Sequence, residues 1–439
     1  MDVFVIEGGR RLNGRIRVNG SKNAALPLLA AGLLTDGDVM LRGVPDLSDI
    51  RNMERLLGEL GAPCERSADG SVSLKVVDDS DSHARYDIVR TMRASICVLG
   101  PLVAKRGGAR VSLPGGCAIG QRPVDLHLRG LEALGARIEL EGGDIIAKAP
   151  ESGRLVGATV FLGGPFGSTV LGTANVMSAA VLADGVTVIE SAACEPEIVD
   201  LAKMLTAMGA RIEGAGSPRI TITGVESLGG VDHRVIPDRI EAGTYMCAAA
   251  ITGGELTLED CPLDAMMAAT DALHHIGVRV DAVGSSDDPM RREVVVTGSG
   301  ELSSVQLTTQ PHPGFPTDLQ AQFMALLTLA NGNSVITEKI FPERFLHVAE
   351  LCRMGASIHR QGATAVVTGV EKLTGAPVMA SDLRASAGLV IAALAARGTT
   401  VVNRVYHIDR GYESLETKLA EVGAMIRRET AESVEGAAV

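Results

Sequence analysis

Tryptophan is absent from this chain, and the other aromatic residues are scarce. The 439 residues include 4 Tyr and 7 Phe, so the cores must be built from aliphatic side chains and Met. Proteins that bind single-stranded nucleic acids stack bases on aromatic rings, and little material for that exists here. Basic charge is also short, because 41 Lys and Arg face 53 Asp and Glu, for a net charge of −12. Phosphate backbones need a basic face, so we expect no nucleic-acid partner.

Long apolar runs and paired cysteines are missing as well. No stretch reaches the roughly 18 apolar residues that span a bilayer, and the N-terminus lacks the pattern of a secretion signal. The seven cysteines are an odd number without a Cys-x-x-Cys pair, which favours reduced thiols over disulfides or a zinc site. We therefore expect a cytoplasmic protein with no membrane partner. An anionic substrate would need a local cluster of Arg and Lys.

An internal repeat recurs six times along the chain. Each copy ends in an apolar stretch and a marker glycine, where a helix C-terminus needs a left-handed residue. The markers are Gly61, Gly135, Gly209, Gly277, Gly355 and Gly423, at spacings of 74, 74, 68, 78 and 68 residues. A second glycine precedes each marker by 23 to 27 residues and opens a strand: Gly37, Gly108, Gly185, Gly254, Gly332 and Gly398.

Each copy should therefore read strand, loop, helix, glycine, strand, which predicts an α/β fold. Six copies could form one ring or two domains of three. We favour two domains, because residues 230–238 are rich in Gly, Pro and charge, as a crossing between domains would be. The expected domains are 22–234 and 1–21 plus 235–428, followed by a flexible tail over 429–439.

The stretch from Leu113 to His127 replaces the ordinary loop of its copy with a glycine-rich flap around Cys117. A thiol on such a loop is presented to solvent or substrate, so thiol chemistry becomes possible. The alternative is a flexible surface loop with an incidental cysteine. Arg122 and Asp125 on the same loop favour a functional role.

Two other motifs place a charged group at the start of a helix. Lys22 follows the cap residue Ser21, where an ammonium group and a helix N-terminus would make an anion site. A solvated lysine beside a cap is the alternative. Asp318 follows two prolines just before an apolar helix and could act as a general base, or could be a plain N-cap.

Four arginines near the ends of predicted elements could share one anionic ligand, since the guanidinium group binds carboxylate and phosphate in a bidentate fork. Each of them alone is more often part of a surface ion pair. They are Arg93, Arg344, Arg384 and Arg410.

These motifs, in this order, resemble the enolpyruvyl transferases of the UDP-N-acetylglucosamine 1-carboxyvinyltransferase family. The resemblance runs from Val5 to about Ile426 and includes Ser-Lys-Asn-Ala, Pro-Gly-Gly-Cys, Pro-Asp-Arg-Ile-Glu, Phe-Pro-Thr-Asp and Tyr-His-Ile-Asp-Arg-Gly-Tyr. It implies a two-domain inside-out α/β barrel with three repeated strand-helix units in each domain. It also implies transfer of the enolpyruvyl group of phosphoenolpyruvate to the 3-hydroxyl of UDP-N-acetylglucosamine, the first committed step of peptidoglycan synthesis, with no metal or organic cofactor.

The resemblance further implies a role for each candidate residue. Cys117 would protonate the methylene carbon of phosphoenolpyruvate, and Asp318 would take the proton of the sugar hydroxyl. The expected phosphoenolpyruvate contacts are Lys22, Asn23, Arg122, Arg344, Arg384 and Arg410. The expected nucleotide-sugar contacts are Asn23, Arg93, Arg122, Pro123, Val124, Asp125, Leu126, Thr169, Val170, Asp318 and Ile340.

One loop departs from the family pattern. Better-known members carry Asp-Lys-Val-Ser where this chain has Pro165 to Thr173, so the basic residue of the diphosphate loop is missing. Three rival functions remain: the shikimate-pathway transferase, which lacks the cysteine flap; a silent paralogue that binds a nucleotide sugar; and a repeat-built interaction protein.

Overall fold

The computed structural model describes residues 1–113, 124–284, 286 and 288–436. The chain divides into two compact units, one made of residues 1–19 and 237–436 and the other of residues 20–113 and 124–236. It passes from one unit to the other between Asn19 and Gly20, and returns between Ile236 and Pro237.

Each unit contains three four-stranded sheets that share one pairing pattern. In every sheet an edge strand pairs in parallel with the next strand, and the remaining two pairs are antiparallel. The strands of residues 20–236, in sheet order, are β16 (Val231–Arg234), β3 (Val39–Arg42), β5 (Val72–Leu74), β4 (Cys64–Arg66); β6 (His83–Ala84), β7 (Gly108–Ser112), β9 (Asp144–Lys148), β8 (Arg137–Glu141); β10 (Thr159–Phe161), β13 (Val186–Glu190), β15 (Arg219–Thr223) and β14 (Arg211–Glu213). A small hairpin adds β11 (Gly163–Gly164) and β12 (Gly167–Ser168).

The second unit repeats this arrangement. Its strands, in sheet order, are β18 (Arg279–Val283), β19 (Arg292–Thr297), β17 (Glu255–Cys261), β2 (Asn13–Arg17); β20 (Gln306–Thr308), β21 (Asn333–Thr337), β23 (Thr364–Thr368), β22 (Ser357–Gln361); β24 (Pro377–Met379), β25 (Thr399–Asn403), β1 (Asp2–Glu7) and β26 (Met425–Thr430). The six predicted copies thus correspond to six sheets. The sheets stay separate, and no closed barrel forms among the described residues.

The helices fall into two kinds. The outer helices are amphipathic and end just before a marker glycine: α2 (Ser48–Glu59), α5 (Asp125–Ala133), α7 (Pro196–Ala207), α9 (Met267–Ile276), α11 (His347–Arg353) and α13 (Leu415–Glu421). All six marker glycines have a positive φ, between 76° and 110°, so the prediction of a left-handed residue there is confirmed.

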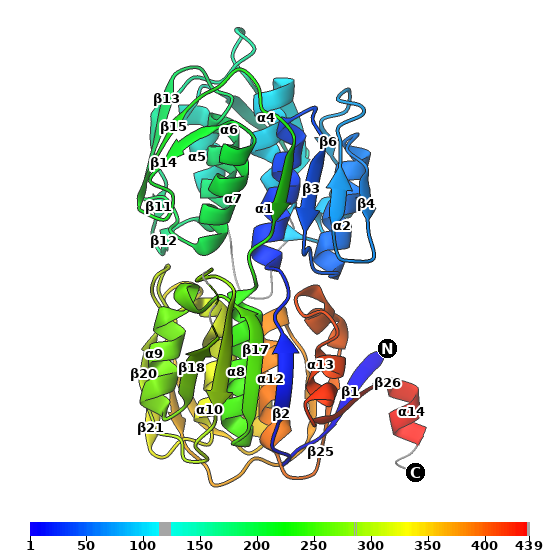
Figure 1. Cartoon of the computed structure of the whole chain (residues 1–439), viewed down its shortest axis with the longest axis vertical. Coiled ribbons are helices and arrows are strands. Elements are labelled where there is room, and N and C mark those ends of the chain that lie inside the picture. Colours follow the sequence, from blue (N-terminus) through cyan, green and yellow to red (C-terminus); the bar gives the residue numbers. More distant parts are fainter. Residues whose placement is uncertain (114–123, 285, 287, 437–439) are drawn as a thin grey trace. The chain divides into compact units, whose positions relative to one another are not determined.

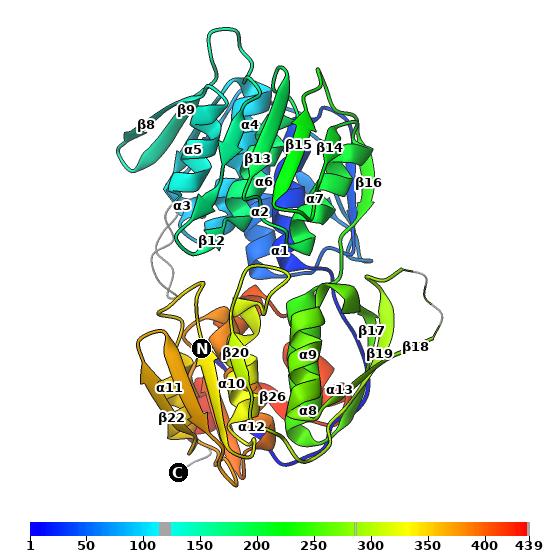
Figure 2. The same ribbon diagram turned by 90° about the vertical axis from the view of Figure 1, so that its left-hand side faces the viewer.

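The inner helices are largely apolar, and most are buried on all sides. They are α1 (Lys22–Ala31), α4 (Leu99–Arg106), α6 (Val170–Ala180), α8 (Arg239–Thr252), α10 (Gln320–Leu327) and α12 (Leu383–Ala395). Within their unit α8, α10 and α12 pack against one another (Figure 1), and strands surround them (Figure 2). No helix in the described ranges is long and apolar enough to cross a bilayer.

The C-terminal segment differs from the expected flexible tail over 429–439. Strand β26 includes Glu429 and Thr430 and pairs with β1, with Asp2 opposite Thr430, and the short helix α14 (Ala431–Gly436) follows. The boundary at 429 was therefore wrong, because pairing with the N-terminal strand extends β26 beyond it.

Candidate active site

Helix N-termini position several of the candidate residues of unit 1–19/237–436. Asp318 lies in the short helix η4 (Thr317–Leu319) just before α10, and Arg384 is the second residue of α12. The N-cap of α12 is Asp382, whose carboxylate accepts hydrogen bonds from the backbone N–H groups of Arg384 and Ala385, at 3.0 and 3.1 Å. Free N–H groups at such ends attract anions.

Asp318 contacts two arginines. Its Oδ1 lies 2.7 Å from Nη1 of Arg344, and its Oδ2 lies 3.4 Å from Nε of Arg384. The carboxylate is 27% exposed, whereas the arginine side chains are 7% and 2% exposed. Buried charges of this kind are stable only when paired and hydrogen-bonded. Arg344 and Arg384 are therefore not the surface ion pairs that the sequence left open. Asp318 is not an N-cap, because Pro316 caps η4 and Leu319 caps α10.

The guanidinium group of Arg384 remains partly unsatisfied. Its Nη1 and Nη2 are buried without a hydrogen-bond partner among the described residues, and the group lies 5.4 Å from the ring centroid of Tyr412. The Tyr412 hydroxyl accepts from Gln322 Nε2 at 3.1 Å and lies 2.9 Å from the hydroxyl of Thr244. Buried donors without partners are costly, and a carboxylate or phosphate ligand would satisfy this pair.

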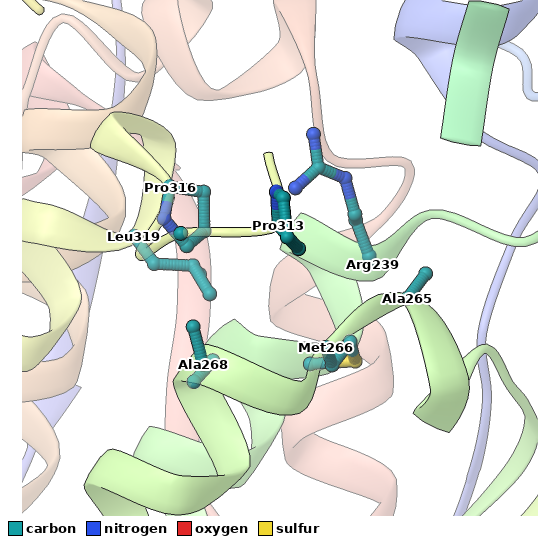
Figure 3. Close-up of a pocket in the computed structure, with 9 residues that line it drawn as sticks. Arg239, Ala265, Met266, Ala268, Pro313, Pro316 and Leu319 are labelled. Atoms are coloured by element: carbon teal, nitrogen blue, oxygen red, sulfur yellow. The ribbon is translucent and has the colours of Figure 1, made fainter. Parts of the chain in front are cut away.

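The segment that leads to Asp318 lines a small, largely apolar pocket. Figure 3 shows it lined by Arg239 at the start of α8, by Met266, and by Pro313, Pro316 and Leu319 from the other side. Asp318 lies between Pro316 and Leu319 in the sequence, so packing of these neighbours limits where its carboxylate can move.

The remaining candidates of this unit are Ile340 and Arg410, both half-buried. Ile340 lies in the turn after β21, and its N–H donates to Glu338 Oε1 at 2.8 Å. Arg410 ends the short helix η5 (Val405–Arg410). Burial and, to a smaller extent, the charge of Arg410 lower the pKa of His407, while Asp382 opposes the shift. Arg410 and Asp382, the N-cap of α12, therefore both lie within electrostatic reach of His407.

In unit 20–113/124–236, Lys22 is the first residue of α1, behind the N-cap Ser21. Its ammonium group lies 3.2 Å from Oδ2 of Asp49, and the two side chains are 9% and 5% exposed. The alternative of a solvated lysine is thus wrong. Asp49, in the first turn of α2, was not singled out from the sequence, because it reads there as an ordinary acidic residue near a helix N-terminus.

Other candidates of this unit also lie at the starts of helices. Thr169 is the N-cap of α6, whose first residue is Val170, and its hydroxyl accepts from Gly172 N–H at 3.2 Å. Arg93 is the first residue of the short helix η2 (Arg93–Val98) and is half-buried. Val124 is the N-cap of α5.

The structure places Asn23, Asp125 and Leu126 within the first turns of their helices, Asn23 in α1 and the other two in α5. Cys117, Arg122 and Pro123 lie outside the described residues. Direct contact is thus established for Asp318 with Arg344 and Arg384. Among the described residues, no group of three or more His, Cys, Asp or Glu side chains could hold a metal ion.

Comparison with protein families gives one match over nearly the whole chain. The family described as EPSP synthase (3-phosphoshikimate 1-carboxyvinyltransferase) matches residues 6–419. Curated relatives from Anaeromyxobacter sp. (strain Fw109-5) and Maricaulis maris (strain MCS10) are 55% and 56% identical to this chain. Both alignments cover 98% of this chain and at least 99% of the relative, and both relatives are named UDP-N-acetylglucosamine 1-carboxyvinyltransferase.

Solved structures give the same result at the level of the fold. The enolpyruvyl transferase NikO from Streptomyces tendae superposes with a TM-score of 0.86 at 27% identity, covering 98% of this chain and 99% of that one. An EPSP synthase from Acinetobacter baumannii superposes with a TM-score of 0.77 at 18% identity, covering 98% and 100%. At that lower identity the likeness concerns the fold alone.

Proposed function

The chain belongs to the EPSP synthase family of carboxyvinyl transferases, and we propose that it transfers the enolpyruvyl group of phosphoenolpyruvate to the 3-hydroxyl of UDP-N-acetylglucosamine. The observation that supports this acceptor is the identity of 55%, over 98% of the chain, with a relative named UDP-N-acetylglucosamine 1-carboxyvinyltransferase. The reaction releases phosphate and is the first committed step of peptidoglycan synthesis.

Asp318 acts as the general base. It takes the proton of the 3-hydroxyl as the hydroxyl oxygen attacks C2 of phosphoenolpyruvate. The pairing of its carboxylate with Arg344 at 2.7 Å and with Arg384 at 3.4 Å supports this role, because the two cations favour the ionised form that a base needs.

The thiol of Cys117 protonates C3 of phosphoenolpyruvate in the same addition, and a tetrahedral intermediate forms. In the elimination that follows, C3 gives a proton back to the Cys117 thiolate, the bond from C2 to the bridging oxygen breaks, and phosphate leaves with that oxygen and with the proton that Asp318 took up. The sugar then carries an enol ether on its 3-oxygen. The thiol is assigned this role because its flap motif matches the family pattern.

Charge neutralisation comes from the basic candidates. Phosphoenolpyruvate carries a phosphate and a carboxylate, and such charge is stabilised by preorganised donors in a site that excludes water. We assign this task to Lys22, Arg122, Arg344, Arg384 and Arg410, with Asn23 beside them. The two Arg384 nitrogens that have no partner in the described part of the chain support a bidentate contact to one of these groups.

The nucleotide sugar is held by Asn23, Arg93, residues 122–126, Thr169, Val170 and Ile340. Thr169 and Val170 start α6, so backbone N–H groups of its first turn can replace the basic residue missing from the diphosphate loop. Neither a metal nor an organic cofactor enters this scheme.

We also propose that each unit is an inside-out α/β barrel built from three repeated strand-helix units. The burial of α8, α10 and α12 on nearly all sides supports this arrangement. A cytoplasmic location follows from the proposed reaction, since both substrates are cytoplasmic metabolites.

Phosphate release from phosphoenolpyruvate tests the acceptor. UDP-N-acetylglucosamine and shikimate 3-phosphate are offered separately, and release with the nucleotide sugar alone is expected. Release with shikimate 3-phosphate alone would contradict the proposed acceptor but would still agree with enolpyruvyl transfer. Release with neither would favour the silent paralogue or an interaction protein.

A further inference from the structure

Glu338 is a fully buried carboxylate that directly follows β21, and it is 0% exposed. Its Oε1 accepts three hydrogen bonds, from the Thr309 hydroxyl at 2.7 Å and from the N–H groups of Ile340 and Phe341 at 2.8 and 2.9 Å. Its Oε2 accepts one, from the Thr317 hydroxyl at 2.9 Å. A buried carboxylate is costly unless hydrogen bonds satisfy it, and here four of them do.

The bond to Oε2 leads to the proposed base. The Thr317 hydroxyl has a single proton, which it donates to Glu338, so it must accept the bond from Nη1 of Arg344 at 3.0 Å. The same Nη1 donates to Oδ1 of Asp318 at 2.7 Å. Glu338 is therefore connected to Asp318 through one hydroxyl and one guanidinium nitrogen.

The bonds to Oε1 lead to the turn that carries a proposed acceptor contact, Ile340. The two backbone N–H groups bound to Oε1 fix the beginning of this turn, and Arg344 N–H closes it by donating to Phe341 carbonyl oxygen at 2.8 Å. Arg344 lies at the end of this turn. Glu338 is therefore hydrogen-bonded both to the turn and, through Thr317, to the arginine that contacts the base Asp318.

We propose that Glu338 is a positioning residue for the transfer reaction. It fixes the base Asp318 and the acceptor-contacting turn at Ile340 relative to each other. This inference rests on the proposed function. A displacement of about 1 Å between reacting groups can lower the rate about 10²-fold, so the relative position of the base and the bound acceptor affects kcat.

The two oxygens of Glu338 can be tested separately. In Glu338→Gln the remaining carbonyl oxygen still accepts the three bonds of Oε1, while the new NH₂ faces the Thr317 hydroxyl. The hydroxyl can no longer donate to residue 338 and loses the orientation in which it accepts from Arg344. Thr317→Val breaks the same link and leaves Glu338 in place. Thr317→Ser keeps the hydroxyl. Thr309→Val removes a donor to Oε1, together with the acceptor of the Lys339 N–H at 2.8 Å, and leaves the Oε2 side intact.

The experiment compares kcat and KM for these four variants and for Glu338→Gln/Thr317→Val, with whichever acceptor supports phosphate release by the wild type. Glu338→Gln and Thr317→Val should each lower kcat by about 10- to 100-fold, with the acceptor KM nearly unchanged. The double variant should be no slower than the slower single variant, because both act on one link. Thr317→Ser should recover most of kcat, and Thr309→Val should raise the acceptor KM instead.

Wild-type kcat in Thr317→Val, or equal losses in Thr317→Ser and Thr317→Val, would overturn the proposal. Thr317 is half-buried, so its variants keep the test valid even where Glu338→Gln does not fold. A wild type that is inactive with both acceptors would overturn the proposed function together with this inference. An active wild type with fully active variants would overturn this inference alone.

Discussion

Arg344 donates from Nη1 to Oδ1 of Asp318 over 2.7 Å, and it does so from a side chain that is only 7% exposed. Because Arg384 lies 3.4 Å from the other carboxylate oxygen, the carboxylate is held from two sides. The orientation of the proposed base is therefore set before any substrate binds, which is the preorganisation that catalysis requires.

Asp318→Asn should lower kcat by about 10²- to 10⁴-fold, since an amide cannot take the proton of the sugar hydroxyl. Steady-state phosphate release measures the effect. Glu343→Gln is the control, because Glu343 directly precedes Arg344 in the chain but its side chain is 75% exposed. Equal activity of Asp318→Asn and the control variant would remove Asp318 from the mechanism.

Lys22→Met should lower kcat/KM for phosphoenolpyruvate by about 10- to 100-fold, because a charge-assisted hydrogen bond to the substrate is lost. Lys22→Arg keeps the charge and should lose less. The control is Lys105→Met, which breaks the 2.8 Å pair with Asp36, a residue whose side chain is 73% exposed. A Lys22→Met enzyme with the control's kinetics would contradict the proposed contact.

N-ethylmaleimide should inactivate the enzyme by alkylating Cys117. Burial raises the pKa of the Cys64, Cys97 and Cys261 thiols to about 12, so these react slowly. Peptide mapping identifies the labelled residue, and Cys352→Ser is the control, since Cys352 is exposed on α11. The role of Cys117 would be excluded if Cys352→Ser alone protected the activity.

His347 should make the fold less stable in mild acid. Burial lowers its pKa from 6.5 to about 4; Asp382 opposes the shift and Arg344 adds to it. Between these values the unfolded chain binds a proton that the native state does not, so stability is lost as the pH falls below about 6.5. At about pH 5 the loss amounts to about 2 kcal/mol.

His347→Phe should abolish this part of the acid sensitivity, because phenylalanine keeps an aromatic ring at this position but has no titratable group. The unfolding midpoint is compared at about pH 7.5 and about pH 5. His275→Phe is the control, since His275 is 69% exposed on α9. An unchanged difference between the two midpoints in His347→Phe would show that His347 titrates normally.

The outer helices and the strands before them could be predicted from the sequence. The repeat predicted a helix ending just before each marker glycine, and α2 and α7 each end two residues before theirs, Gly61 and Gly209. Inner helices such as α8 and α12 gave no periodic signal, because a helix that is buried all round is apolar all round. The pairing of Asp2 with Thr430 has no local signal at all.

For the site, motifs identified Asp318, Arg344 and Arg384 but not their contacts. Glu338 was missed, because an acidic residue after a strand looks like a surface residue until the fold buries it. Asp49 was missed for the same reason. Both owe their importance to donors from distant segments, which sequence spacing does not reveal.

The chemical structure of the product shows whether the enolpyruvyl group is transferred to the 3-hydroxyl of the nucleotide sugar. Phosphoenolpyruvate and UDP-N-acetylglucosamine are incubated with the enzyme, and the nucleotide product is examined by proton–carbon correlation NMR. An enolpyruvyl ether on the 3-oxygen of the sugar is expected. An unmodified nucleotide sugar, or a group attached to a different oxygen, would contradict it.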